Sequence, residues 1–203
     1  METKALSSAI NKIAVGYIFI YFSINIAVID ILPDWLGYFM IVSALPLLAE
    51  KEKSALLLRP FGIALGIWNI AELVLNSLTY EWKLTLISLI TGIITIYFHF
   101  QLLTNIASLD IDPSKRKRLL MFRTATVILH TLLVLWLFIP QTLINNEVYV
   151  CIALYMSVTQ IVLCLWITGE LFGLSKAMKA QEPESCEAYN SAEKPNKAEA
   201  DTK

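Results

Sequence analysis

Six apolar segments of roughly membrane-spanning length follow one another along this chain and leave little of it for any other structure. The hydrocarbon core of a bilayer is about 30 Å thick, and a helix needs about 20 apolar residues to cross it. Because lipid offers the backbone no hydrogen-bond partners, a crossing segment has to be helical. The segments are Lys12–Leu32, Trp35–Ala49, Pro60–Tyr80, Trp82–Leu109, Leu119–Ile139 and Val148–Ser175. We therefore predict an all-α integral membrane bundle of six transmembrane helices.

The second segment is the shortest and has Pro46 near its end. At 1.5 Å per residue its helix would be about 22 Å long, which is less than the thickness of the hydrocarbon core. The sequence leaves open whether this helix crosses the bilayer fully or is re-entrant.

Composition excludes the common soluble classes. Hydrophobic residues make up 57% of the chain and charged residues 16%, whereas a soluble domain typically has about 25% charged residues. A cytoplasmic enzyme, a nucleic-acid-binding domain and a disulfide-stapled module are therefore not expected. The three cysteines form no CxxC or Cys/His cluster, so the sequence predicts neither a metal site nor a cofactor.

The distribution of basic residues predicts the orientation, because Lys and Arg favour the cytoplasmic side of a membrane. With six crossings, Lys83 is the one basic residue of 16 that falls on the outer side. We predict that both termini are cytoplasmic. The domains are then a short cytoplasmic N-terminus over 1–11, a transmembrane domain over 12–175 and a polar cytoplasmic tail over 176–203, which is expected to be disordered.

The segment Asp30–Tyr38 is predicted to form the first outer turn. Pro33 cannot continue a helix and disfavours a helical residue before it, and Asp34 is placed to cap the next helix. This segment is either a rigid turn alone or, through Asp30 and Asp34, an acidic mouth on the outer face.

The same nine residues, Asp-Ile-Leu-Pro-Asp-Trp-Leu-Gly-Tyr, carry a family resemblance. The segment resembles a stretch found between the first two membrane spans of small uncharacterised polytopic proteins of Gram-positive bacteria. The resemblance implies a bacterial cytoplasmic membrane as the location and implies no activity.

Polar side chains inside the apolar segments are the candidate functional residues, because ionisable groups in a membrane are costly and normally face the interior of a bundle. Counted from the expected outer helix ends, Glu72 lies about 12 Å deep, His130 about 15 Å and His99 about 25 Å. We expect Glu72 and His130 in one interior cluster with an asparagine; a purely structural hydrogen-bonding role is the alternative. The candidate intramembrane site comprises Glu72, His130, Asn69, Asn76, Asn25 and His99.

Helical spacing supports this selection and also offers a plainer interpretation. Ser88, Gly92, Thr95 and His99 follow a three-four spacing that places them on one face of a helix. Such stripes of small and hydroxyl residues are also typical of packing seams between membrane helices.

No enzyme motif of the HExxH, GxSxG or Walker type occurs, so no catalytic residue is predicted. The basic run of Lys115, Arg116, Lys117 and Arg118 is expected to set orientation and to contact anionic lipid headgroups. The favoured function is permeation of a small solute or ion, with proton linkage, through the polar interior. The alternative is a non-catalytic accessory, regulatory or immunity-type protein acting through helix–helix contacts. Expected partners are the lipid bilayer and either another membrane protein or a second copy of the chain; nucleic acid is not expected.

Overall fold

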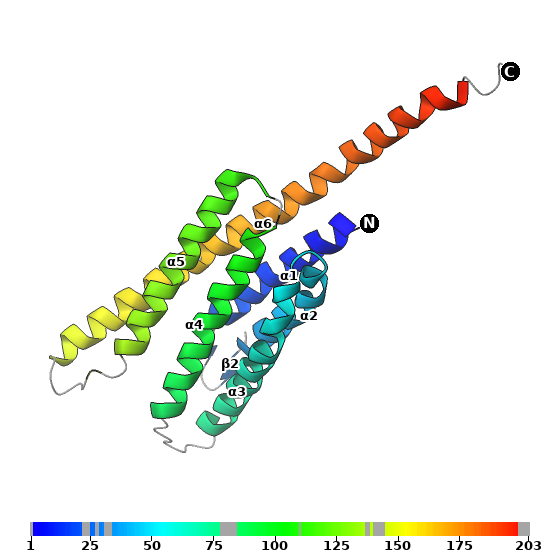
Figure 1. The fold of residues 1–203 in the computed structure, drawn as a ribbon. Coiled ribbons are helices and arrows are strands. Elements are labelled where there is room, and N and C mark those ends of the chain that lie inside the picture. Colours follow the sequence, from blue (N-terminus) through cyan, green and yellow to red (C-terminus); the bar gives the residue numbers. More distant parts are fainter. Residues whose placement is uncertain are drawn as a thin grey trace.

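The computed structural model describes residues 2–21, 25–26, 29–30, 34–77, 85–109, 111–136, 139 and 145–198. Over these ranges the chain forms an all-α bundle with one short antiparallel strand pair (Figure 1). The elements are α1 Glu2–Tyr21, β1 Asn25–Ile26, β2 Ile29–Asp30, α2 Asp34–Ala49, the 3₁₀-helix η1 Lys53–Leu58, α3 Arg59–Ser77, α4 Thr85–Ala107, α5 Pro113–Trp136 and α6 Asn146–Ala198.

Neighbouring helices run antiparallel. In the α4–α5 pair, Gly92 lies against Val134, and Arg123 reaches back to Thr104. In the α1–α6 pair, Ser7 and Ser175 exchange hydrogen bonds of 2.8 and 3.0 Å between hydroxyl and carbonyl groups. This alternation brings the beginning of α1 and the C-terminal part of α6 to the same end of the bundle (Figure 1).

Four helical stretches are long and apolar enough to cross a membrane, namely 53–75, 86–107, 113–136 and 146–180, and Asp34–Ala49 is a shorter apolar helix. These stretches indicate a multi-pass membrane protein. The structure thus agrees with the expected all-α architecture, whereas six crossings and the orientation remain predictions.

The first helix is displaced from its predicted position. It was expected over Lys12–Leu32, but α1 ends at Tyr21, and Asn25 then pairs with Asp30 in the two-stranded sheet. The prediction counted apolar residues only, and the segment after Tyr21 is rich in isoleucine and valine, which favour extended structure. The helix α1 begins ten residues before the predicted segment, because its N-terminal half is amphipathic. Ile10 and Ile13 are fully buried there, although polar residues interrupt this part of the sequence.

The C-terminal segment 176–203, expected to be disordered, is helical as far as Ala198. Residues 176–190 consist mostly of Ala, Glu, Lys, Gln and Met, which are strong helix formers. The polarity of the segment therefore does not prevent a helix, although the domain boundaries given above stay predictions.

Fully buried aliphatic side chains fill the core at the end of the bundle that carries the termini. Large aliphatic side chains from α1, α2, α4 and α5 are buried against one another there, among them Ile10, Leu45, Leu48, Leu102, Leu103, Ile106 and Leu119. This layer separates that end of the bundle from the polar site described next.

Candidate functional site

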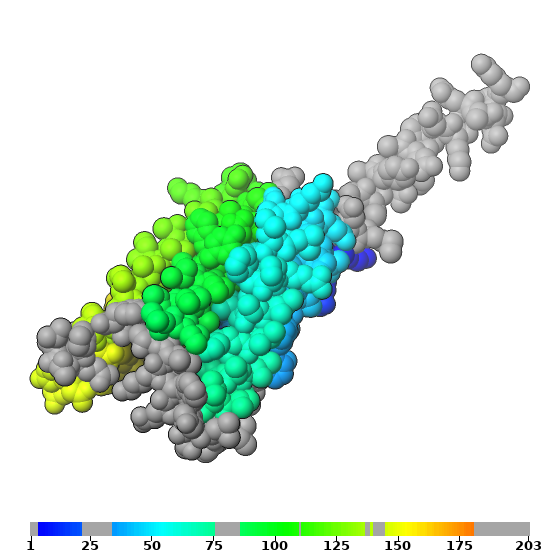
Figure 2. Space-filling view, turned by 60° about the horizontal axis from the view of Figure 1, so that its bottom comes forward, coloured from blue at the N-terminus to red at the C-terminus, as the bar shows by residue number. Residues whose placement is uncertain are grey.

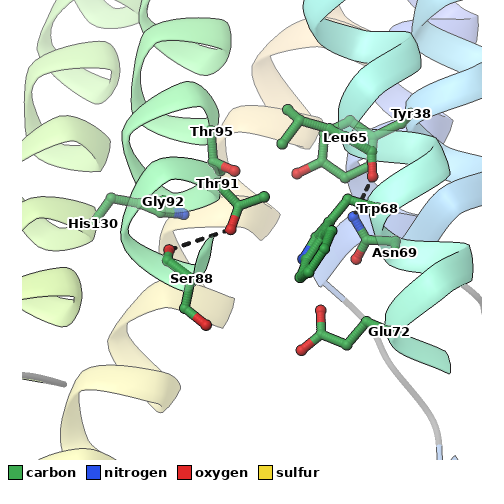
Figure 3. Close-up of a pocket in the computed structure, with 10 residues that line it drawn as sticks. All are labelled: Tyr38, Leu65, Trp68, Asn69, Glu72, Ser88, Thr91, Gly92, Thr95 and His130. Carbon is green, nitrogen blue, oxygen red and sulfur yellow. Dashed lines mark hydrogen bonds between the residues drawn. The ribbon is translucent and has the colours of Figure 1, made fainter. Parts of the chain in front are cut away.

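A cavity of about 430 Å³ lies between α3 and α4, and His130 reaches toward it from α5, on the far side of α4 (Figure 3). The space-filling view shows α3 beside α4 and α4 beside α5 (Figure 2). Phe61 of α3 and Tyr97 of α4 meet with ring centroids 5.1 Å apart on the side toward the termini. The residues that line the cavity are Tyr38, Leu65, Trp68, Asn69, Glu72, Ser88, Thr91, Gly92, Thr95 and His130.

The two main walls arise from helical periodicity. On α3, Leu65, Trp68, Asn69 and Glu72 recur every three or four residues and so share one face. The polar residues of α4 do the same, as the spacing of Ser88, Gly92 and Thr95 predicted.

Gly92 allows α5, which forms the third wall of the cavity, to lie close to α4. A Cβ atom on Gly92 would lie 2.7 Å from Cγ2 of Val134, so a larger residue there would push α5 away. The glycine lets α5 approach α4 closely enough for His130 to form part of the cavity wall.

The walls present several hydrogen-bond acceptors to the cavity. The amide nitrogen of Asn69 donates to the Leu65 carbonyl at 2.8 Å, which leaves its own carbonyl oxygen available. The Thr91 hydroxyl donates to the Ile87 carbonyl at 2.6 Å. Figure 3 shows the Asn69 oxygen and the Glu72 carboxylate facing the space between α3 and α4.

Behind His130 lies a buried cluster of imidazole and phenol rings. The rings of His130 and His99 are 5.8 Å apart between centroids, and His99 is 1% exposed. Nδ1 of His99 lies 3.2 Å from the Tyr17 hydroxyl. Tyr21 and Tyr38 also contact the His99 ring, at 5.6 and 6.3 Å between centroids. The cluster therefore joins α1, α2, α4 and α5 at the back of the cavity.

Several polar atoms of this region find no hydrogen-bond partner among the described protein groups. They include Nε2 of His99, Nδ1 of His130 and the Thr126 hydroxyl. Buried polar groups are usually hydrogen-bonded. The described protein groups therefore do not satisfy all the polar atoms of this region.

The structure brings together three of the predicted site residues and places a fourth behind them. Glu72, Asn69 and His130 line one cavity, and His99 contacts His130 from the buried side. Of the rest, Asp34 begins α2. The side chains of Asn25, Asn76 and Asp30 lie outside the described part, and so do residues 31–33 of the predicted outer turn, so the acidic mouth of Asp30 and Asp34 stays a prediction.

The expected depth difference between His99 and His130 is wrong, since their rings are in contact. The prediction measured each residue from its own helix end and took the ends as level. The Gly92–Val134 contact shows that they are staggered, because α4 continues from Gly92 back to Thr85, whereas α5 ends soon after Val134, at Trp136.

The basic run at the start of α5 divides into two pairs. Arg118 forms an ion pair with Glu170 of α6, with Nε and Oε1 2.9 Å apart, and Lys115 donates to the Gly173 carbonyl at 3.4 Å. Arg116 and Lys117 are exposed. The predicted contact with lipid headgroups therefore rests most directly on Arg116 and Lys117.

A second polar group, missed in the sequence, lies at the end of the bundle that carries the termini. The Glu52 carboxylate accepts hydrogen bonds from the hydroxyls of Ser54 at 2.9 Å and Ser108 at 3.1 Å. These bonds lower the pKa of Glu52. Asn105, which is 2% exposed, lies 2.9 Å from the Ser54 hydroxyl. The group ties the α2–α3 connection to the end of α4; the spacing of Asn105 and Ser108 on one helix face was the available signal.

Among the described residues, no group of three or more His, Cys, Asp or Glu side chains could hold a metal ion. No protein-family model, curated protein or solved structure matches this chain. The site has to be interpreted from its own chemistry.

Proposed function

We propose that this chain is a six-span membrane protein that moves a small polar solute or ion across the bilayer through the cavity between α3 and α4, with Glu72 and His130 exchanging protons. The observation that carries the proposal is the juxtaposition of a carboxyl and an imidazole in one cavity of about 430 Å³. Carboxyl and histidine side chains within a membrane are typical of ion pathways and proton relays.

The packing of the bundle supports a cavity that is open on one side only. Leu102, Leu103 and Ile106 of α4 are fully buried between the His99 cluster and the end of the helix. A solute in the cavity would have to pass this apolar layer. Transport therefore requires a second arrangement of the helices, as expected where access alternates between the two sides.

The proposal is tested by reconstituting the full chain into vesicles that contain a pH-sensitive dye. A proton gradient is imposed with mixtures of small amines, amino acids or sugars outside. We expect the protein to accelerate the pH change with at least one mixture, and Glu72→Gln to abolish that acceleration. Glu147→Gln is the matched control, because Glu147 is exposed at the start of α6 and lies outside the cavity. Equal pH changes with wild-type, Glu72→Gln and protein-free vesicles would refute transport.

One feature favours the accessory function as a second candidate. Gly169 and Gly173 lie one turn apart on α6, and a Cβ atom on either would meet nothing within 4 Å. Such spacing permits close approach of another membrane helix. Replacing both glycines by isoleucine should disrupt a complex in the membrane and leave the pH change intact if the two functions are separate.

A further inference from the structure

We infer that the cavity between α3 and α4 binds a small organic ammonium ion. The inference rests on the proposed function, since it names the class of solute that the same cavity would take. It follows from the hydrogen-bonding capacity, charge and aromatic content of the cavity walls.

The walls offer acceptors to a ligand. One of the two Asn69 amide hydrogens and the Thr91 hydroxyl hydrogen are donated to carbonyls of their own helices, at 2.8 and 2.6 Å. Both side chains still present acceptors to the cavity, a carbonyl oxygen and hydroxyl lone pairs, and Asn69 keeps one free N–H. Together with the Glu72 carboxylate, they select for a ligand that donates hydrogen bonds.

Apart from His130, the proton partner in the proposed function, the described lining residues offer no basic group that could balance the Glu72 carboxylate. Glu72 is the acidic residue among the described lining residues, and none of those residues is a Lys or Arg. A carboxylate at this depth is stable as an ion only with a counter-charge or with water. The Glu72 side chain is exposed, so a cationic ligand can reach it and supply that charge. An anion would meet the carboxylate and the acceptor oxygens.

Two aromatic side chains favour an organic cation over a metal ion. Trp68 lies next to Asn69 and Glu72 on the α3 wall, and Tyr38 closes the back (Figure 3). Indole and phenol faces attract ammonium groups and accommodate their alkyl substituents. Calcium, by contrast, takes six to eight oxygen ligands, more than one carboxylate and a few scattered oxygens provide. The cavity volume falls within the range of small-molecule sites, about 300–1,000 Å³.

The test uses the full chain in lipid nanodiscs and measures binding by calorimetry and by tryptophan fluorescence. The probes are choline and butylammonium, with butanol as the neutral counterpart and butyrate as the anionic one. We expect the two cations to bind and to change the fluorescence, and butanol and butyrate to bind at least about tenfold more weakly, because neither brings a positive charge to the Glu72 carboxylate. Glu72→Gln should weaken cation binding by about tenfold or more, whereas Glu147→Gln should not. Trp68→Phe should remove the fluorescence change.

Any other outcome of the binding experiment overturns the inference, and the outcomes can be told apart. If no probe binds, or if butanol or butyrate binds as well as butylammonium, the cavity does not select ammonium ions. If Glu72→Gln is folded by circular dichroism and binds the cations as the wild type does, the ligand is not held by Glu72. In each case the pH change in vesicles decides separately whether transport itself stands, because that assay also contains uncharged and zwitterionic solutes.

Discussion

At the scale of single residues, Glu72 differs from the other polar groups of the bundle. His99 is buried, and one of its ring nitrogens has a protein partner, Tyr17. Glu72 is exposed to the cavity, and no described side chain forms an ion pair or hydrogen bond with it. A residue that stabilises the fold would be engaged with other protein groups, so the surroundings of Glu72 favour a role in ligand or proton binding.

Replacing Glu72 should therefore affect stability very little. Because no protein partner is left unsatisfied, we expect Glu72→Gln and Glu72→Leu to change the free energy of unfolding by less than about 0.5 kcal/mol, as for surface substitutions. Thermal unfolding in detergent, followed by circular dichroism, measures this. A large loss of stability in Glu72→Leu alone would show that the carboxyl is a structural hydrogen-bonding group.

Tyr17 should behave in the opposite way. Tyr17→Phe removes the hydroxyl that lies 3.2 Å from Nδ1 of the buried His99, which should cost about 1–3 kcal/mol. Tyr155→Phe is the control, since Tyr155 is 74% exposed. If both variants unfold at the wild-type temperature, the hydrogen bond does not stabilise the bundle.

At the scale of helices, glycines decide how closely neighbours pack. A Cβ atom on Gly37 of α2 would lie 2.5 Å from the Gly16 carbonyl oxygen and 2.6 Å from Cγ1 of Ile20, both on α1. The Gly16 oxygen is a backbone atom, so no side-chain rotation can relieve the contact. The α1–α2 crossing therefore depends on glycine in a way that the free glycines of α6 do not.

Two alanine substitutions should change stability in opposite directions. Gly37→Ala overpacks the α1–α2 contact and should destabilise by about 1–3 kcal/mol. Gly173→Ala meets nothing within 4 Å and should stabilise by up to about 1 kcal/mol through helix propensity. Unfolding in a denaturing detergent series compares the two. Equal effects would mean that α1 and α2 do not approach as described.

The connection between α2 and α3 should respond to pH through Glu52. Hydrogen bonds from Ser54 and Ser108 lower the pKa of this carboxyl from its ordinary value of 4.5. A carboxyl with a lowered folded-state pKa stabilises the fold above its ordinary pKa, and this contribution is lost as the pH falls through the lowered value. Unfolding temperatures of wild-type protein and Glu52→Gln should converge as the pH drops below about 4.5. A constant difference across this range would contradict the assignment.

At the scale of the whole molecule, apolar length and helical spacing predict much of the fold and part of the site. They place the starts of α2, α3, α4 and α6 within three residues but that of α5 six residues late, and they put Asn69, Glu72 and His130 on the faces that meet in the cavity. They misplace α1, because its N-terminal half is amphipathic rather than uniformly apolar. They also misjudge relative depth, because the stagger of α4 and α5 depends on the Gly92–Val134 contact, which forms only in the folded bundle.

We propose that water reaches the Glu72 cavity from the outer side of the membrane and does not enter the buried layer around Leu103. Cysteine labelling tests it most directly, in a variant whose native cysteines are replaced, with a charged, membrane-impermeant thiol reagent added outside intact cells. We predict that Ser88→Cys, in the cavity wall, is labelled and that Leu103→Cys, which is fully buried, is not. Labelling of Ser88→Cys only after the cells are opened, or no labelling of Ser88→Cys in folded protein, would contradict the account.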